Sequence, residues 1–182
     1  MNELQWGDRV EALIESIGPP LTVSRVMAQC ASTQEHARAM GLGAVVVAQR
    51  QTGGRGQWGN VWADTGDEGL AFSLVLPATD QPQRSAALAQ AIVDALEPQL
   101  SGRVAVKHPN DVLLDGMKLA GVLIEQADGL AVIGIGINVA QETWPDVLAG
   151  TAISLRQAGI QFDRLDVLGR VLPRIVRAWA AG

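Results

Sequence analysis

Residues 105–138 constrain the fold more than any other part of the chain, because they predict consecutive strands joined by tight turns. The pairs Asp115-Gly116 and Asp128-Gly129 interrupt apolar runs, and Asp-Gly is a strong signal for a two-residue hairpin turn. A short strand at 104–107 and a Pro-Asn-Asp corner precede the first hairpin. The segment therefore predicts three further strands, at residues 112–114, 118–126 and 130–139.

Apolar spacing and turn residues predict the elements of the remaining chain. The predicted helices cover residues 7–17, about 33–40, 82–100, 151–158 and 163–180. The predicted strands cover residues 21–29, 43–49 and 69–77. Ser32 or Thr33 is the expected N-cap of the second helix, with Glu35 completing a capping box, and Asp163 caps the last helix. This order predicts an α+β domain with a mixed, largely antiparallel sheet backed by helices.

Composition bounds the class of protein. A chain of 182 residues with 48% hydrophobic and 18% charged residues predicts a single globular domain, residues 1–182. The net charge of −5 argues against nucleic acid as a partner, since phosphate binding needs clustered Lys and Arg. Cys30 is the only cysteine, so no intramolecular disulfide is possible. With no signal peptide and no membrane-length apolar run, a cytoplasmic location is expected.

Residues 51–62 form a glycine-rich loop that lacks the spacing of a P-loop. Its closely spaced glycines allow backbone N–H groups to approach an anion, and Arg55 adds a charged fork. The alternative is an ordinary surface hairpin with glycines at positive φ. Trp58 and Trp62 favour the binding role, because exposed indoles usually cover something.

Lys107 and Lys118 are the only lysines of a chain that otherwise uses arginine. Lys107 can be a solvated strand end, whereas the apolar neighbours of Lys118 leave it either extending to solvent or holding an anion. Asn110-Asp111 is either a simple turn or an acceptor pair for a sugar, a metal or a lysine. Asn138 ends the apolar run 134–138, which suggests contact with a ligand.

Two other kinds of site find no support in the sequence. The only histidines, His36 and His108, have no cysteine near them, so no protein zinc or other metal site is predicted. No serine lies in a Gly-Xaa-Ser-Xaa-Gly elbow, so a serine hydrolase is not indicated.

Five motifs, in order and in register, resemble the catalytic core of biotin–protein ligases in the biotin/lipoate ligase superfamily. The resemblance covers about residues 20–160. The motifs are Ser32-Thr33, the loop 51–56 with Trp62, the corner 107–111, the strand 118–125 and the strand 134–138. The resemblance implies a fold like that of class II aminoacyl-tRNA synthetases.

The resemblance also implies a reaction. Biotin and ATP, with Mg²⁺, would give biotinyl-5′-AMP, and the biotinyl group would pass to a lysine on the biotin carrier domain of a carboxylase. The family often forms homodimers, which the sequence leaves open here. Because the reacting groups belong to the substrates, the protein would mainly hold anions together and stabilise charge on phosphorus.

The resemblance assigns roles to individual residues. Lys118 and Arg55 would be catalytic, and Asp111 would support Lys118 or Mg²⁺. The biotin-binding residues would be Ser32, Thr33, Gln34, Gln51, Gly54, Arg55, Gly56, Gln57 and Lys118. The ATP-binding residues would be Trp62, Asn110, Asp111 and Asn138.

The sequence departs from the family pattern in three ways. Gln57 and Asn60 are neutral where the family loop carries further arginines, and His108 replaces a tryptophan. Residues 1–182 contain neither the DNA-binding domain nor the small C-terminal β domain common in the family, so transcriptional regulation is not expected. Two alternatives therefore stay open: a biotin-binding relative without transfer activity, and a lipoate or octanoate ligase-like protein. Cys30 precedes the Ser-Thr corner, which disfavours a catalytic cysteine of the octanoyl-transfer type.

Overall fold

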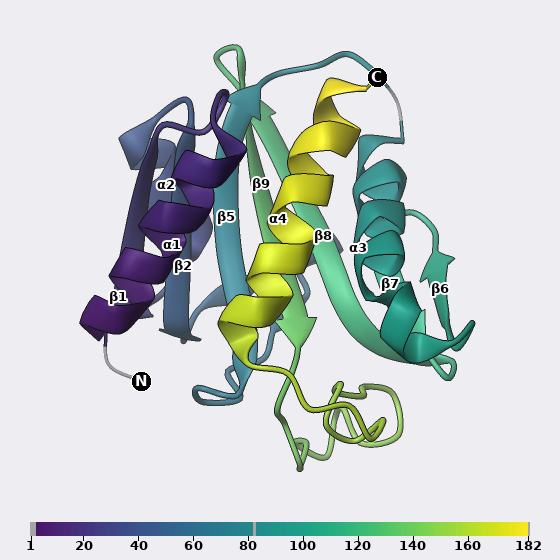
Figure 1. Ribbon diagram of the computed structural model, residues 1–182. Helices are drawn as coiled ribbons and strands as arrows, with labels where there is room; N and C mark the ends of the chain where they lie inside the picture. Colours follow the sequence, from purple (N-terminus) through teal and green to yellow (C-terminus); the bar gives the residue numbers. More distant parts are fainter. Residues whose placement is uncertain (1–2, 82, 182) are drawn as a thin grey trace. The chain divides into compact units, whose positions relative to one another are not determined.

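The computed structural model describes residues 3–81 and 83–181 (Figure 1). These residues divide into two compact units. Unit 1 contains the chain up to Asp80 and Leu123–Gly136, and unit 2 contains Gln81–Val122 and the chain from Ile137 onward. Two strands, β8 (Met117–Ala127) and β9 (Leu130–Asn138), contribute residues to both units. None of the described helices is long and apolar enough to cross a membrane.

Unit 1 carries five neighbouring strands in the order β1-β2-β5-β9-β8. Its elements are α1 (Glu3–Ile17), β1 (Val23–Cys30), α2 (Thr33–Met40), β2 (Ala44–Gln51), β3 (Gly54–Arg55), η1 (Gln57–Gly59), β4 (Val61–Trp62) and β5 (Gly69–Pro77). Strand β1 runs parallel to β2, and β2 runs antiparallel to β5. Strands β3 and β4 form a separate two-stranded hairpin. The predicted mixed sheet is confirmed.

The core of unit 1 explains why β5 is apolar along almost its whole length and β2 is apolar from Ala44 to Ala48. Ala37 of α2 packs on one face of the sheet against Val46, Val75 and Val132, all fully buried. Helix α1 packs on β1 and buries Trp6, Val10 and Ile14. Each buried aliphatic side chain of this size contributes about 1.5–3 kcal/mol relative to exposure. The core thus holds β2 and β5 rigidly, and polar residues at their ends are positioned by it.

Unit 2 contains strands in the order β8-β7-β6 and two long helices. Its elements besides β8 and β9 are α3 (Arg84–Leu100), β6 (Val104–Lys107), β7 (Asp111–Leu114) and α4 (Arg164–Ala180). Adjacent strands of this set are antiparallel. Both predicted hairpin turns are confirmed: Asp115 and Gly116 have φ of 52° and 80°, and Asp128 and Gly129, in unit 1, have 53° and 76°. Positive φ at both central residues matches the strand twist.

Helices α3 and α4 pack against each other, as their apolar faces predict. The Asp163 side chain accepts a hydrogen bond of 2.8 Å from the Leu165 amide, which confirms it as the N-cap of α4. Helix α3 begins at Arg84, and the predicted start at Pro82 lies outside the described residues.

The predicted helix at 151–158 is wrong. The chain there forms turns, and Ala152 makes an isolated parallel bridge with Lys118. The Lys118 amide donates to Thr151, and the Ile153 amide donates to the Lys118 carbonyl. Backbone groups that a helix would have used are bonded to the end of a strand, which local apolar spacing does not reveal.

The predicted capping box on α2 is also wrong. Ser32 occupies the N-cap position, but its side chain makes no capping hydrogen bond. The side chain of Gln51, eighteen residues away, instead accepts from the Thr33 amide at 2.9 Å. A residue distant in sequence therefore satisfies the first turn of the helix.

Candidate functional site

The corner between β1 and α2 gathers polar side chains of unit 1. The Thr33 hydroxyl donates to Gln51 Oε1 at 3.0 Å and lies 2.7 Å from the Ser73 hydroxyl, which is therefore the donor in that pair. Thr33 and Ser73 are buried, so their hydrogen bonds are needed to offset desolvation. The side-chain oxygen of Gln51 accepts both from the Thr33 amide and from the Thr33 hydroxyl. The Gln51 Nε2 group makes no hydrogen bond within the described residues and remains available as a donor.

Two glycines of β9 allow polar and aromatic side chains to lie directly on the sheet. A Cβ at Gly134 would be 2.7 Å from the Gln34 side chain, and one at Gly136 would be 2.5 Å from the Trp62 indole. Both positions therefore require glycine for close packing. Gln34 is buried and Trp62 is half-buried.

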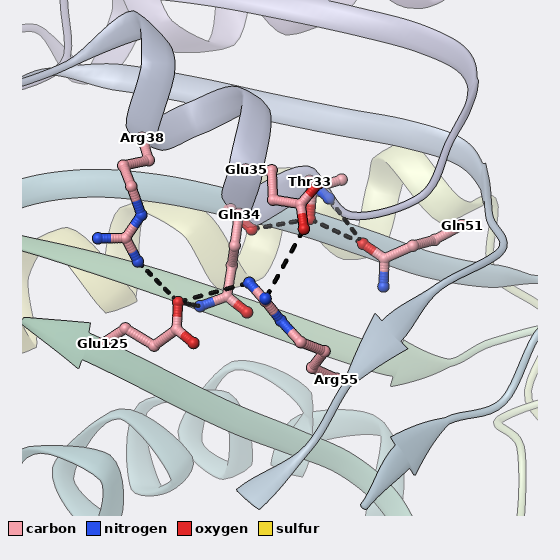
Figure 2. Close-up of polar contacts among 8 residues, drawn as sticks. Thr33, Gln34, Glu35, Arg38, Gln51, Arg55 and Glu125 are labelled. Carbon is pink, nitrogen blue, oxygen red and sulfur yellow. Dashed lines mark hydrogen bonds and ion pairs between the residues drawn. The ribbon is translucent and has the colours of Figure 1, made fainter. Parts of the chain in front are cut away.

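Charged side chains surround the glycine-rich loop (Figure 2). Glu125 Oε2 accepts from Arg38 Nη2 at 2.7 Å and from Gln34 Nε2 at 3.5 Å. Arg55 Nη2 lies 3.6 Å from the same oxygen, and Arg55 Nη1 lies 3.7 Å from Glu35. The loop arginine is thus flanked by two carboxylates.

The loop itself folds as the β3–β4 hairpin. Gly54 pairs with Trp62, and a Cβ at Gly54 would lie within 2.9 Å of both Trp62 and Gln51 Nε2. The Gly56 amide donates to Asn60 at 2.7 Å. Gly54 must therefore be glycine because neighbouring atoms lie too close for a Cβ, and not because of its φ. Among the glycines of this loop, only Gly59 has positive φ. The hairpin interpretation holds, but the loop also shapes the neighbouring polar corner.

The base and tip of the hairpin differ. At the base, Arg50 makes a bidentate pair with Asp64, and hydrogen bonding from Arg50 lowers the pKa of that carboxyl group. At the tip, Gln57 is half-buried, whereas Trp58 is 94% exposed. The binding role expected for Trp58 stays a prediction.

Unit 2 holds the second group of predicted residues, around Lys118. The Lys118 ammonium nitrogen lies 2.7 Å from Asp111 Oδ1, so the two side chains form an ion pair. Asn138 donates through Nδ2 to the Lys118 carbonyl at 3.0 Å, and its Oδ1 accepts from Gln141 at 3.4 Å. Asn138 is 5% exposed. Its amide therefore braces the Lys118 backbone. Asn110, in turn, donates to the Val122 carbonyl at 2.9 Å.

Comparison with known proteins decides the family. The sequence pattern of the biotin/lipoate A/B protein ligase family matches residues 27–141. The chain belongs to this family. It is 39% identical over 142 residues to the bifunctional ligase/repressor BirA of Bacillus spizizenii, covering 71% of this chain and 44% of BirA. It is 35% identical over 139 residues to a biotin–[acetyl-CoA-carboxylase] ligase of Mycobacterium tuberculosis, covering 71% and 52%.

A solved relative gives the same result. The biotin protein ligase of Aquifex aeolicus, in complex with biotin and ATP, superimposes with a TM-score of 0.80 at 32% identity, covering 88% of this chain and 71% of that one. The chain spans about half the length of the curated relatives it matches.

The predicted ligase residues therefore fall into two groups, each held together within one unit. Unit 1 positions Ser32, Thr33, Gln34, Gln51, Gly54, Arg55, Gly56, Gln57 and Trp62. Unit 2 positions Asn110, Asp111, Lys118 and Asn138. Lys107 is exposed at the end of β6, in register with Asp111.

Sequence reasoning missed three residues that this ligase-family fold brings into the two groups. Arg38 pairs with Glu125, the last residue of the strand motif 118–125, Ser73 completes the polar corner, and Gln141 braces Asn138. Ser73 carried a readable signal, since it is the one polar residue in the fully buried part of β5. Arg38 carried none, because its partner Glu125 is 87 residues away, and nothing in the sequence marked Gln141, three residues from Asn138.

The environment of Cys30 disfavours the thiolate that an acyl-transfer nucleophile needs. The Cys30 side chain is 7% exposed, and burial, followed by the charge of Glu35, raises the pKa of the thiol. A thiol with a raised pKa forms little of the reactive thiolate. No group of three His, Cys, Asp or Glu side chains suited to a metal ion occurs among the described residues.

Proposed function

We propose that this chain is an ATP-dependent biotin–protein ligase core that forms biotinyl-5′-AMP and transfers biotin to a lysine of a carboxylase's biotin carrier domain. The observation that carries the proposal is the likeness, over 88% of the chain, to a ligase that binds biotin and ATP. The five sequence motifs and the Lys118–Asp111 ion pair support the proposal.

The polar corner of unit 1 suits the ureido ring of biotin, which presents both N–H donors and a carbonyl acceptor. Gln51 Nε2 offers a donor, and the Ser32 and Thr33 hydroxyls and the Gln34 amide offer further polar atoms. Gly54 and Gly56 let the backbone approach the ligand closely, and Gln57 follows them on the hairpin. These residues would bind and orient biotin.

The first half-reaction requires an anion to attack another anion. A biotin carboxylate oxygen attacks the α-phosphorus of ATP, the bond to the β-phosphate oxygen breaks, and pyrophosphate leaves. Lys118 and Arg55 would neutralise the carboxylate and the phosphate oxygens. Asp111 keeps the Lys118 ammonium oriented. Mg²⁺ would enter with ATP as part of the substrate.

The second half-reaction needs no protein nucleophile. The carrier lysine amine attacks the carbonyl carbon of the mixed anhydride, AMP leaves with the electron pair, and an amide forms. Trp62, Asn110 and Asp111 would contact the nucleotide. The Asn138 amide is committed to Lys118 and Gln141, so its proposed contribution to ATP binding runs through the position of Lys118.

The proposal is tested by biotin-dependent exchange of labelled pyrophosphate into ATP, followed by label transfer to a purified biotin carrier domain. Exchange and transfer are expected with biotin. Exchange with lipoate but not with biotin would place the chain with lipoate ligases. Biotin binding by calorimetry without exchange would identify a binding protein without transfer activity.

Gln57→Arg is predicted to slow release of biotinyl-5′-AMP. Gln57 is half-buried on the hairpin that carries Arg55, so an arginine there adds one charge-assisted contact to the phosphate. Such a contact is worth about 1.5–3 kcal/mol, which predicts release slower by about tenfold or more. Release is measured by filter binding of labelled adenylate. An unchanged release rate would show that the neutral residue at this position does not matter.

A further inference from the structure

Four charged side chains of unit 1 form a neutral group beside the hairpin, here named the Glu125 cluster: Arg38, Arg55, Glu35 and Glu125 (Figure 2). They come from α2, β3 and β8, so the sheet and its helix bring them together. All four are between 34% and 59% exposed. Each contact is therefore weakened by solvent, and small differences in geometry decide which pairs dominate.

The distances rank the contacts of Glu125. The Arg38–Glu125 separation of 2.7 Å is that of a charge-assisted hydrogen bond. The Arg55–Glu125 and Arg55–Glu35 separations of 3.6 and 3.7 Å exceed hydrogen-bond length. Arg38 therefore holds the shared oxygen of Glu125, and Arg55 is kept between two carboxylates by charge alone.

This arrangement leaves Arg55 available. A guanidinium has five N–H donors in a fork that fits a carboxylate or phosphate. An anionic ligand that reaches hydrogen-bond distance would replace the two longer ion pairs of Arg55. Without Arg38, Glu125 would have Arg55 as its nearest cation, and the carboxylate would compete directly with the ligand.

We propose that Arg38 and Glu125 are positioning residues that set the availability of Arg55 for the ligand's anion. While no ligand is bound, the Arg55–Glu125 ion pair restrains the β3–β4 hairpin. Arg38 weakens this ion pair because it binds the same carboxylate oxygen of Glu125. The inference rests on the proposed function for the identity of the anion, the carboxylate of biotin or the α-phosphate of ATP. The first prediction below concerns the ligand-free protein and does not rest on the proposed function.

The first test measures tryptic cleavage after Arg55 in the ligand-free protein, followed by mass spectrometry of the peptide that ends there. In Glu125→Gln, Arg55 loses its ion pair with Glu125, so cleavage is expected to be about fivefold faster. In Arg38→Gln, Glu125 pairs more strongly with Arg55, so cleavage is expected to be about fivefold slower. The matched control is Glu142→Gln, which removes the carboxylate of an exposed Arg156 pair in unit 2. Equal cleavage rates in all four proteins would overturn the proposal.

The second test is a double-mutant cycle in pyrophosphate exchange. Arg38→Gln is expected to raise KM for ATP by about tenfold, with kcat within about twofold, because Glu125 then competes for Arg55. In the Glu125→Gln background the same change is expected to cost less than about twofold, and Arg38→Lys is expected to restore most of the loss. An equal cost in both backgrounds would show that Arg38 acts only through the stability of α2, contrary to the proposal.

The two tests separate failure of the inference from failure of the proposed function. If wild-type protein shows no biotin-dependent exchange, the ligase assignment fails, yet altered tryptic cleavage still supports the role of the Glu125 cluster. If exchange occurs but neither cleavage nor KM responds to Arg38 and Glu125, the ligase assignment stands and the positioning role is excluded.

Discussion

Lys118→Ala is expected to lower biotin-dependent pyrophosphate exchange by about a thousandfold or more. The Lys118 ammonium nitrogen lies 2.7 Å from Asp111 Oδ1. The Lys118 backbone amide donates to the Thr151 carbonyl, and the Lys118 carbonyl accepts from the Ile153 amide and from Asn138 Nδ2. Loss of a positioned charge that neutralises two approaching anions is worth several kcal/mol in the transition state.

The controls separate lost chemistry from lost folding. Arg103→Ala breaks another exposed ion pair of unit 2, the one between Arg103 and Asp115. This change is expected to leave the exchange rate within about twofold of the wild-type rate. Asp111→Asn combined with Lys118→Ala removes the unpaired carboxylate and is expected to restore thermal stability but not exchange. Full activity of Lys118→Ala would refute its catalytic assignment.

The sequence predicts elements well wherever local chemistry determines them. The Asp115-Gly116 and Asp128-Gly129 turns define their hairpins because few residues other than Gly, Asn and Asp accept positive φ. Asp163 caps α4 through a partner two residues away. In each case the residues that determine the structure lie next to one another in the chain.

Prediction fails where the partner is distant. The segment 151–158 has helical apolar spacing, but it bonds to Lys118 more than thirty residues earlier. Glu125 meets Arg38 and Arg55 across separations of 87 and 70 residues, which no local pattern records. The motifs could be found in the sequence, but the pairing of Glu125 with Arg38 and Arg55 required the fold.

Gly136→Ala is expected to raise KM for ATP by about thirtyfold, the second largest effect predicted for this chain. Gly136 does not have positive φ, so alanine fits its backbone and only the added Cβ matters. That atom would lie 2.5 Å from Trp62 Cε2 and 2.6 Å from Cζ2, so the indole must move. An aromatic ring stacked on a base contributes about 1–3 kcal/mol, which a displaced Trp62 would lose.

The contact itself is tested by combining Gly136→Ala with Trp62→Leu, measured by KM for ATP and by thermal unfolding. If the added methyl group acts by displacing the indole, Gly136→Ala should cost less than about threefold once the indole is absent. Gly7→Ala is the matched control, because a Cβ there meets nothing within 4 Å. An undiminished cost in the Trp62→Leu background would mean that the β9 backbone, and not the indole, is what Gly136 protects.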